Sequence, residues 1–172
     1  MAILGSPNYR VGLIVARAQP FHNGHLKIIT DALMMCDEVI FSIRGYDNSF
    51  FDYNFAQKLY RKLFNLVDRV AFFGTEFDPT LGTPKHHLIR TLEKLNAARY
   101  HTPTHFFHDN DLWLDAAKEV QLNTFKIVRQ PYVDSDAIIE SINNSTKEWK
   151  EKVPYHLIED IETYIATKRR NF

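Results

Sequence analysis

Two histidines three residues apart, His22 and His25, carry the clearest chemical signal in this chain of 172 residues. They lie in a turn over 17–25 that contains Pro, Asn and Gly and directly follows the apolar run 11–16. Imidazole nitrogens can hydrogen-bond phosphate oxygens and, when protonated, neutralise negative charge that develops in a transition state. The pair therefore predicts a site that handles phosphate.

The residues after this turn place apolar side chains at positions 26, 29, 33 and 34, which predicts a helix over 26–35. His25 would lie at the first turn of that helix, where unpaired backbone N–H groups and the positive end of the dipole favour an anion. Gly24 has no Cβ, so a phosphate could approach the backbone closely. Arg17, at the end of the preceding strand, could reach the same phosphate.

The sequence RAQPFHNGHL at 17–26 resembles the signature of the nucleotidylyltransferase superfamily. The His-x-Gly-His motif of that signature corresponds to residues 22–25. The longer string is most similar to the opening of nicotinamide-nucleotide adenylyltransferases of the archaeal and bifunctional bacterial type. Those enzymes have Gly-Arg-Phe-Gln-Pro before the motif, where this chain has Ala16 and Ala18 in place of Gly and Phe. The resemblance implies an enzyme that joins nicotinamide mononucleotide and ATP to give NAD and pyrophosphate, with Mg²⁺ bound mainly by the substrate phosphates. Nicotinic acid mononucleotide is a further expected acceptor.

Two alternatives stay open. One is another enzyme of the same fold, a pantetheine-phosphate adenylyltransferase or a cytidylyltransferase, although the Arg-x-Gln-Pro lead disfavours it. The other is a catalytically impaired nucleotide-binding or regulatory protein.

The resemblance also assigns residues to the ATP side of the site. His22, His25 and Arg17 are the expected catalytic residues. The expected ATP-binding residues are Ala16, Arg17, Gly24, His25, Asn110 and Ser135. Asn110 matches an asparagine that in the family follows a strand near the adenosine.

The expected mononucleotide-binding residues are Arg44, Tyr46, Lys58 and Trp113. Arg44 and Tyr46 belong to a polar loop that leaves the second predicted strand. Lys58 stands where the family has a phosphate-binding arginine, and Arg61 is the alternative on the same predicted helix. Trp113 or Tyr132 could stack on the planar, electron-poor nicotinamide ring, although such aromatics more often serve packing.

The second superfamily signature, Ile-Ser-x-Thr-x-Ile-Arg at the start of a late helix, is degenerate here. The segment 147–154 resembles the sequence that follows this signature, which makes 133–140 its counterpart. Ser135 is kept, the threonine becomes Asp136 or Ala137, and the arginine becomes Ile139 or Glu140. Loss of a charged phosphate contact typically costs about 10²-fold in rate, and Asp136 would also repel a triphosphate. Three interpretations of the missing arginine stay open. The protein catalyses slowly, another cation replaces the arginine, or the protein binds nucleotides without catalysis. The candidate replacement cations are Lys126, Arg129 and Lys147.

No metal site held by the protein is predicted. Asp109 and Asp111 could serve a divalent cation through water, or equally could cap the helix that starts near Leu112. His86 and His87 are adjacent in a predicted helix and point about 100° apart, which makes them a poor chelate. The sequence contains no Cys/His cluster with zinc spacing.

Composition bounds the class of protein. Apolar residues make up 45% and aromatic residues 13% of the chain, as in globular proteins. The expected organisation is one domain over 1–172, with an irregular leader over 1–9 and a C-terminal helical segment over 144–172. A formal net charge of zero gives no basic field for nucleic acid. The lone Cys36 cannot form an internal disulfide.

Neither a signal peptide nor an apolar run of 18 residues is visible, so we expect a cytoplasmic protein that does not bind membranes. Its expected partners are small-molecule nucleotides, and self-association into a homo-oligomer stays open.

Strand-like apolar runs alternate with helical patterns. Strands are predicted over 11–16, 38–43, 69–73, 105–108 and 124–128. Helices are predicted over 26–35, 54–66, 84–97, 112–120, 135–142 and 154–168. This alternation predicts an α/β fold with a Rossmann-like parallel sheet and helices on both faces. Ligands of such folds bind beyond the carboxyl ends of the strands, which is where the turn 17–25 would lie.

Overall fold

The computed structural model describes residues 8–44, 50–65, 67–75, 82–109, 111–128 and 133–170. Within these residues, five parallel strands form one sheet in the order β3-β2-β1-β4-β5. The strands are β1 (Val11–Ala16), β2 (Glu38–Arg44), β3 (Val70–Thr75), β4 (His105–His108) and β5 (Asn123–Lys126).

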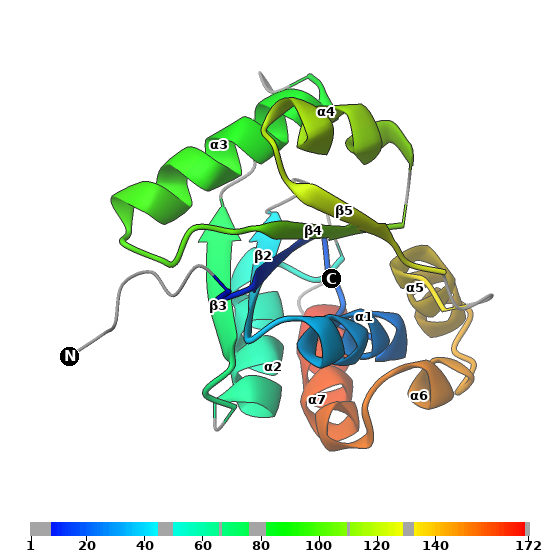
Figure 1. Ribbon diagram of the computed structural model, residues 1–172. Coiled ribbons are helices and arrows are strands. Elements are labelled where there is room, and N and C mark those ends of the chain that lie inside the picture. Colours follow the sequence, from blue (N-terminus) through cyan, green and yellow to red (C-terminus); the bar gives the residue numbers. More distant parts are fainter. Residues whose placement is uncertain are drawn as a thin grey trace.

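Helices cover both faces of this sheet (Figure 1). One face carries α3 (Pro84–Ala97) and α4 (Leu114–Glu119), with the 3₁₀ turn η1 (Asp111–Trp113) leading into α4. The other face carries α1 (Asn23–Met35), α2 (Tyr53–Phe64), α5 (Ser135–Asn143), α6 (Trp149–Lys152), the 3₁₀ turn η2 (Tyr155–Leu157) and α7 (Ile158–Arg170). The predicted α/β, Rossmann-like architecture is therefore confirmed. Among the helices described, none is long and apolar enough to cross a membrane.

Each face of the sheet has its own apolar core. Side chains that alternate along a strand point to opposite faces, so neighbouring strand residues supply different cores. The core beneath α1, α2 and α7 includes Phe21, Ile29, Phe41, Leu59 and Ile161. The core beneath α3 and α4 includes Leu13, Ile40, Leu88, Phe106 and Ala117.

Strand β1 lies at the centre of the sheet, between β2 and β4. It pairs with β2 from Val11↔Glu38 to Ala16↔Ile43, and with β4 from Gly12↔His105 to Ile14↔Phe107. The chain builds β2 and β3 on one side of β1, and then β4 and β5 on the other. This reversal creates a crevice at the carboxyl ends of β1 and β4, the usual ligand position in sheets of this kind.

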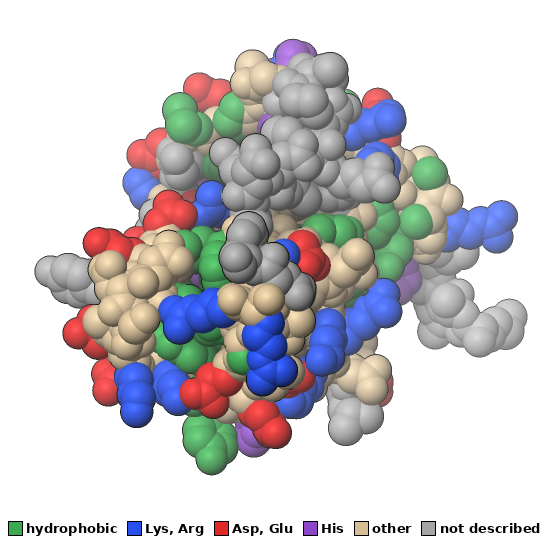
Figure 2. Space-filling model, turned by 180° about the vertical axis from the view of Figure 1, so that it is seen from behind, with side chains coloured by type: hydrophobic (Ala, Val, Ile, Leu, Met, Phe, Trp, Pro, Cys, Tyr) green, Lys and Arg blue, Asp and Glu red, His purple; other side chains and the backbone are tan. Residues whose placement is uncertain are grey.

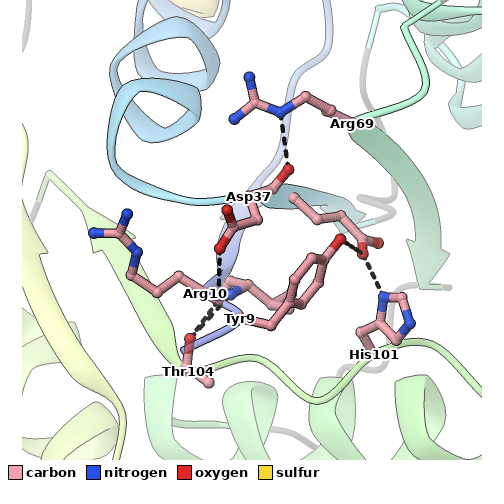
Figure 3. Close-up of polar contacts among 8 residues, drawn as sticks. Tyr9, Arg10, Asp37, Arg69, His101 and Thr104 are labelled. Atoms are coloured by element: carbon pink, nitrogen blue, oxygen red, sulfur yellow. Dashed lines mark hydrogen bonds and ion pairs between the residues drawn. The ribbon is translucent and has the colours of Figure 1, made fainter. Parts of the chain in front are cut away.

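Side-chain contacts to the backbone fasten the amino end of the sheet (Figure 3). The Asp37 Oδ2 atom accepts from the backbone N–H of Arg10 at 2.7 Å, and the Asp37 carbonyl accepts from Arg69 Nε at 2.9 Å. The Thr104 Oγ1 atom accepts from the backbone N–H of Val11 at 3.0 Å. These bonds fix where β1 and β2 begin, at the end of the sheet opposite the crevice.

Several predicted boundaries are wrong for identifiable reasons. Helix α2 starts at Tyr53, and not at the predicted residue 54, because Asp52 is its N-cap, with Oδ1 accepting from the backbone N–H of Phe55 at 2.8 Å. The predicted helix over 112–120 is divided into η1 and α4. The predicted helix over 154–168 likewise begins with η2. A 3₁₀ turn keeps nearly helical side-chain spacing, so the apolar pattern does not reveal these breaks.

Candidate functional site

A cavity of about 430 Å³ opens at the carboxyl ends of β1 and β4. Its walls come from β1 and the turn after it, the start of α1, the ends of β2 and β4, η1, and the start of α5. The lining residues are 14–18, His22, Gly24, His25, Lys27, Ile28, Arg44, 106–109, Trp113, Val128 and 133–136.

This cavity brings most of the predicted site residues together. Those that line it are Ala16, Arg17, His22, Gly24, His25, Arg44, Trp113 and Ser135. Two predicted residues, Tyr46 and Asn110, lie outside the described residues, as do the alternatives Tyr132 and Arg129.

Lys58 is not among the cavity-lining residues. It lies on α2, where its Nζ is 3.1 Å from Asp160 Oδ1 of α7. Lys62 pairs with the same carboxylate, and its hydrogen bond is the largest of the effects that lower the pKa of Asp160. In Figure 2, basic and acidic side chains lie side by side over the lower half of the molecule, where α2, α6 and α7 lie. The described position of Lys58 therefore belongs to this surface network.

The histidine pair is built into the start of α1. His22 is the N-cap, and its Nδ1 accepts from the backbone N–H of Gly24 at 3.1 Å. The Nδ1 of His25 accepts in turn from the backbone N–H of His22 at 3.3 Å. The ring centroids are 3.8 Å apart, and the two residues are only 7% and 8% exposed. Because both Nδ1 atoms accept, each neutral ring carries its proton on Nε2, a donor suited to a phosphate oxygen.

Gly24 was predicted to let a phosphate approach the backbone, and the structure shows that it also leaves room for the His22 ring. A Cβ at this position would lie 2.9 Å from Cε1 and Nδ1 of the His22 ring, closer than real Cβ atoms approach other atoms. Any larger residue would therefore displace the capping histidine. The close approach of a phosphate to this glycine stays a prediction.

The turn before α1 is held in an unusual backbone conformation. Ala18 has φ 47°, in the left-handed region, and is almost fully buried. A non-glycine residue in that region costs about 1–2 kcal/mol, which the surrounding packing must offset. The Phe21 ring is completely buried, with its centroid 5.4 Å from that of His25. Phe21 thus anchors the turn that positions the histidines.

A short ion pair and a long, weak hydrogen bond connect the start of α5 with this turn. Arg17 Nη2 lies 2.7 Å from Asp136 Oδ1, and the Ser135 hydroxyl donates to the Pro20 carbonyl at 3.4 Å. Asp134 is the N-cap of α5, with Oδ1 accepting from the backbone N–H of Ala137 at 2.7 Å. The segment predicted as the counterpart of the second signature therefore meets the turn 17–25 at the cavity.

Two basic side chains of the cavity wall, His108 and Lys27, were not predicted as site residues. His108 is the last residue of β4 and is 5% exposed. Its position at the carboxyl end of a predicted strand was a usable signal, because ligands bind at that edge. Lys27 gave no such signal, since a lysine on a helix is usually a solvated side chain. Its Nζ lies 2.5 Å from Asp31 Oδ2.

The two predicted substitute cations that the structure describes, Lys126 and Lys147, lie outside the cavity lining. Lys126 does not line the cavity, and its Nζ lies 2.9 Å from Asp111 Oδ2. Lys147 is also absent from the lining.

The carboxylates considered for a cation separate in the structure. Asp109 lines the cavity, whereas Asp111 pairs with Lys126. Helix α4 itself has Trp113 as its N-cap and no side-chain cap bond. Among the described residues, no group of three His, Cys, Asp or Glu side chains could hold a metal ion.

No family model and no curated protein sequence matches this chain. Solved structures do share its fold. A bifunctional NMN adenylyltransferase/ADP ribose pyrophosphatase from Francisella tularensis, complexed with AMP and a manganese ion, has a TM-score of 0.63 and 16% identity over 84% of this chain and 44% of that one. Thermotoga maritima TmcAL bound with alpha-thio ATP has a TM-score of 0.67 and 13% identity over 94% of this chain and 56% of that one. The chain thus spans about half the length of these proteins.

Proposed function

We propose that this protein is a nucleotidylyltransferase that transfers the adenylyl group of ATP to nicotinamide mononucleotide, giving NAD and pyrophosphate. The observation that carries the proposal is the histidine pair, His22 and His25, held at the first turn of α1 inside a cavity at the sheet's switch point. Proteins of the same fold support it, because one is an NMN adenylyltransferase complexed with AMP and another was bound with an ATP analogue.

The reaction needs no covalent intermediate with the protein. An oxygen of the mononucleotide 5′-phosphate attacks the α-phosphorus of ATP, the bond from that phosphorus to the bridging oxygen breaks, and pyrophosphate leaves. The protein supplies positioning and electrostatic stabilisation. The Nε2–H groups of His22 and His25 would donate to oxygens of the α-phosphate. The positive end of the α1 dipole would add to this stabilisation.

The acceptor would lie between residues that follow different strands. Arg44 ends β2 and lines the cavity, where its guanidinium would meet the phosphate of the mononucleotide. Trp113 lines the cavity from η1 and would stack on the nicotinamide ring. Lys58 is left out of this proposal because its ammonium group pairs with Asp160 on α7.

Mg²⁺ fits this site as a companion of the substrate phosphates. Asp134 is engaged as a helix cap and Asp136 as the partner of Arg17, so neither offers a ready ligand. Asp109 lines the cavity and would act through a water molecule. Bound Mg²⁺ supplies neutralisation of phosphate charge, while the residues of this chain orient the two nucleotides.

A second candidate function is nucleotide binding without turnover. The pairing of Arg17 with Asp136 favours it, because the expected phosphate-binding arginine already has a carboxylate partner.

One experiment separates these candidates. The protein is mixed with Mg²⁺, ATP and one acceptor at a time: nicotinamide mononucleotide, nicotinic acid mononucleotide or pantetheine phosphate, with CTP and a phosphate acceptor as a further arm. Pyrophosphate is measured. Release only with a pyridine mononucleotide supports the proposal, and release with another acceptor identifies another enzyme of this fold. No release in any arm, together with ATP binding, supports the non-catalytic function.

A further inference from the structure

Two opposite charges face each other inside the cavity. Arg17 comes from the turn after β1 and Asp136 from the first turn of α5, and their Nη2 and Oδ1 atoms are 2.7 Å apart. The Arg17 side chain is 31% exposed, whereas the Asp136 side chain is 83% exposed. The arginine is therefore part of the cavity wall, and the aspartate reaches it from the solvent side.

At the start of α5, acidic side chains of the chain itself already compensate the partial positive charge of the helix dipole. Asp134 caps the helix through the backbone N–H of Ala137, and Asp136 adds a second carboxylate in the first turn. A helix N-terminus ordinarily favours an external anion, but here the chain's own carboxylates occupy that position. An incoming phosphate at this end would meet two negative charges and a paired arginine.

The start of α1 has the opposite character. It has no acidic residue in its first turn, and imidazole side chains provide its capping bonds. A phosphate at the histidine pair meets donors, while a phosphate further toward α5 meets Asp136. The charge that a ligand encounters thus changes along the cavity.

We propose that Asp136 is a specificity-determining residue that limits the number of uncompensated phosphates the site accepts. It does so by holding Arg17 as its own counter-ion and by repelling phosphates that extend beyond the one at His22 and His25. A nucleoside monophosphate binds without displacing this pair, whereas a metal-free triphosphate must compete with Asp136 for Arg17. This inference rests on the proposed function, because it takes the α-phosphate to lie at the histidine pair.

The test is a binding series with AMP, ADP and ATP in EDTA, measured by isothermal titration calorimetry on the full chain. Asp136→Asn removes the charge and keeps the size of the side chain. We expect it to raise the affinity for ATP about five- to tenfold, that for ADP less, and that for AMP less than about twofold. Glu140→Gln is the matched control, because it removes the same charge one turn later on α5, from an exposed position outside the cavity lining.

The role of Arg17 is tested by repeating Asp136→Asn in an Arg17→Ala protein. The gain in ATP affinity should be smaller there, because no arginine is released to the phosphates. An equal gain with and without Arg17 would overturn the ion-pair mechanism. Equal gains for AMP and ATP, or a gain with Glu140→Gln as large as with Asp136→Asn, would overturn the assignment of Asp136.

The two proposals fail in different ways. If neither the wild type nor the variants bind any of the three nucleotides, the nucleotide site itself is wrong, and the role of Asp136 falls with it. If nucleotides bind with the same phosphate preference in both proteins, only the role of Asp136 is wrong.

Discussion

The helices α1 and α5 both begin at the cavity, yet their first turns use the same backbone physics in opposite ways. Each N-terminus presents unpaired N–H groups and a partial positive charge. At α1 the cap is His22, and at α5 the cap is Asp134. An imidazole cap leaves the positive end uncompensated, whereas a carboxylate cap neutralises it.

This difference shows that a helix start becomes an anion site only if the side chains around it leave its charge uncompensated. The first turn of α1 contains no acidic residue, while the first turn of α5 contains Asp136. We therefore expect chemistry to depend strongly on the start of α1 and to be restrained by the start of α5.

The largest expected effect is at α1. His25→Ala should lower adenylyl transfer about 10²- to 10³-fold, because it removes a donor to the charge that develops at the α-phosphate. Pyrophosphate release under saturating substrates measures it. His156→Ala is the matched control, since His156 is exposed and does not line the cavity.

His25 also accepts a backbone hydrogen bond from His22, so the variant could lose activity through a disturbed cap. His25→Asn keeps an acceptor near the position of Nδ1 and should fold like the wild type while remaining inactive. Full activity in a folded His25→Ala protein would contradict the assignment of His25 to the chemistry.

The next effect is expected from rebuilding α5 as a phosphate-binding helix. Asp136→Thr combined with Ile139→Arg should lower the ATP KM or raise kcat about tenfold, provided the new guanidinium reaches the phosphates. The matched variant is Asp136→Thr with Glu140→Arg, which tests the alternative register.

The two registers differ in their cost to the fold. Ile139 packs against the core and should lose some stability as arginine, whereas Glu140 is exposed. If both variants fold and neither gains activity, the contrast between α1 and α5 does not limit ATP use.

A smaller effect concerns the fit of the α1 cap. Glycine to alanine inside a helix normally stabilises a protein by about 0.5–1 kcal/mol. At Gly24 we expect the opposite sign, a loss of about 1–2 kcal/mol, because the added Cβ would lie 2.9 Å from the His22 ring. Urea unfolding measures the free energy of unfolding, and an increase for Gly24→Ala would show that the His22 ring is free to move.

A substitution in the first turn of α5, Ser135→Ala, should leave the free energy of unfolding nearly unchanged. Ser135→Ala removes a hydrogen bond of 3.4 Å to the Pro20 carbonyl, which is too long to contribute much. The expected loss is below about 0.5 kcal/mol.

The start of α1 was predictable because its signals are local. An apolar strand, a Pro/Asn/Gly turn and a helical pattern follow one another, and they fix where His22 and His25 lie. The sheet and its covering helices followed from the same kind of alternation. Helix ends were less accurate, since a cap such as Asp52 is decided by one side-chain bond.

The neighbourhood of α5 could not be predicted in the same way. The Arg17–Asp136 pair joins residues 119 positions apart, so no local pattern announces it. Lys58 shows a related limit, because its position on α2 did not reveal that its ammonium group pairs with α7. Contacts of this kind depend on how helices dock, which a single sequence does not specify.

The last prediction compares two ion pairs, one in the cavity and one outside it. Asp160 is the less exposed acid: its side chain is 16% exposed against 83% for Asp136. The hydrogen bond from Lys62 is the largest effect that lowers the pKa of Asp160 below its ordinary value of 3.8, and burial only partly opposes it. A carboxylate whose pKa is lowered by folding stabilises the folded state above its unfolded pKa and loses that contribution as the pH falls through the folded pKa.

Asp160→Asn should therefore lower the free energy of unfolding at pH 7 by up to about 1 kcal/mol, because its lysine partners are largely exposed. The difference from the wild type should shrink as the pH falls below the ordinary carboxylate pKa of 3.8, because the unfolded chain then binds a proton that the folded chain binds only at lower pH. Asp136→Asn should leave the free energy of unfolding nearly unchanged over the same range, because its carboxylate is exposed on the solvent side of the cavity. Urea unfolding of the two variants at pH 7 and pH 3.5 makes the comparison. A larger loss for Asp136→Asn than for Asp160→Asn would mean that the Arg17–Asp136 pair serves the fold, and not the choice of ligand.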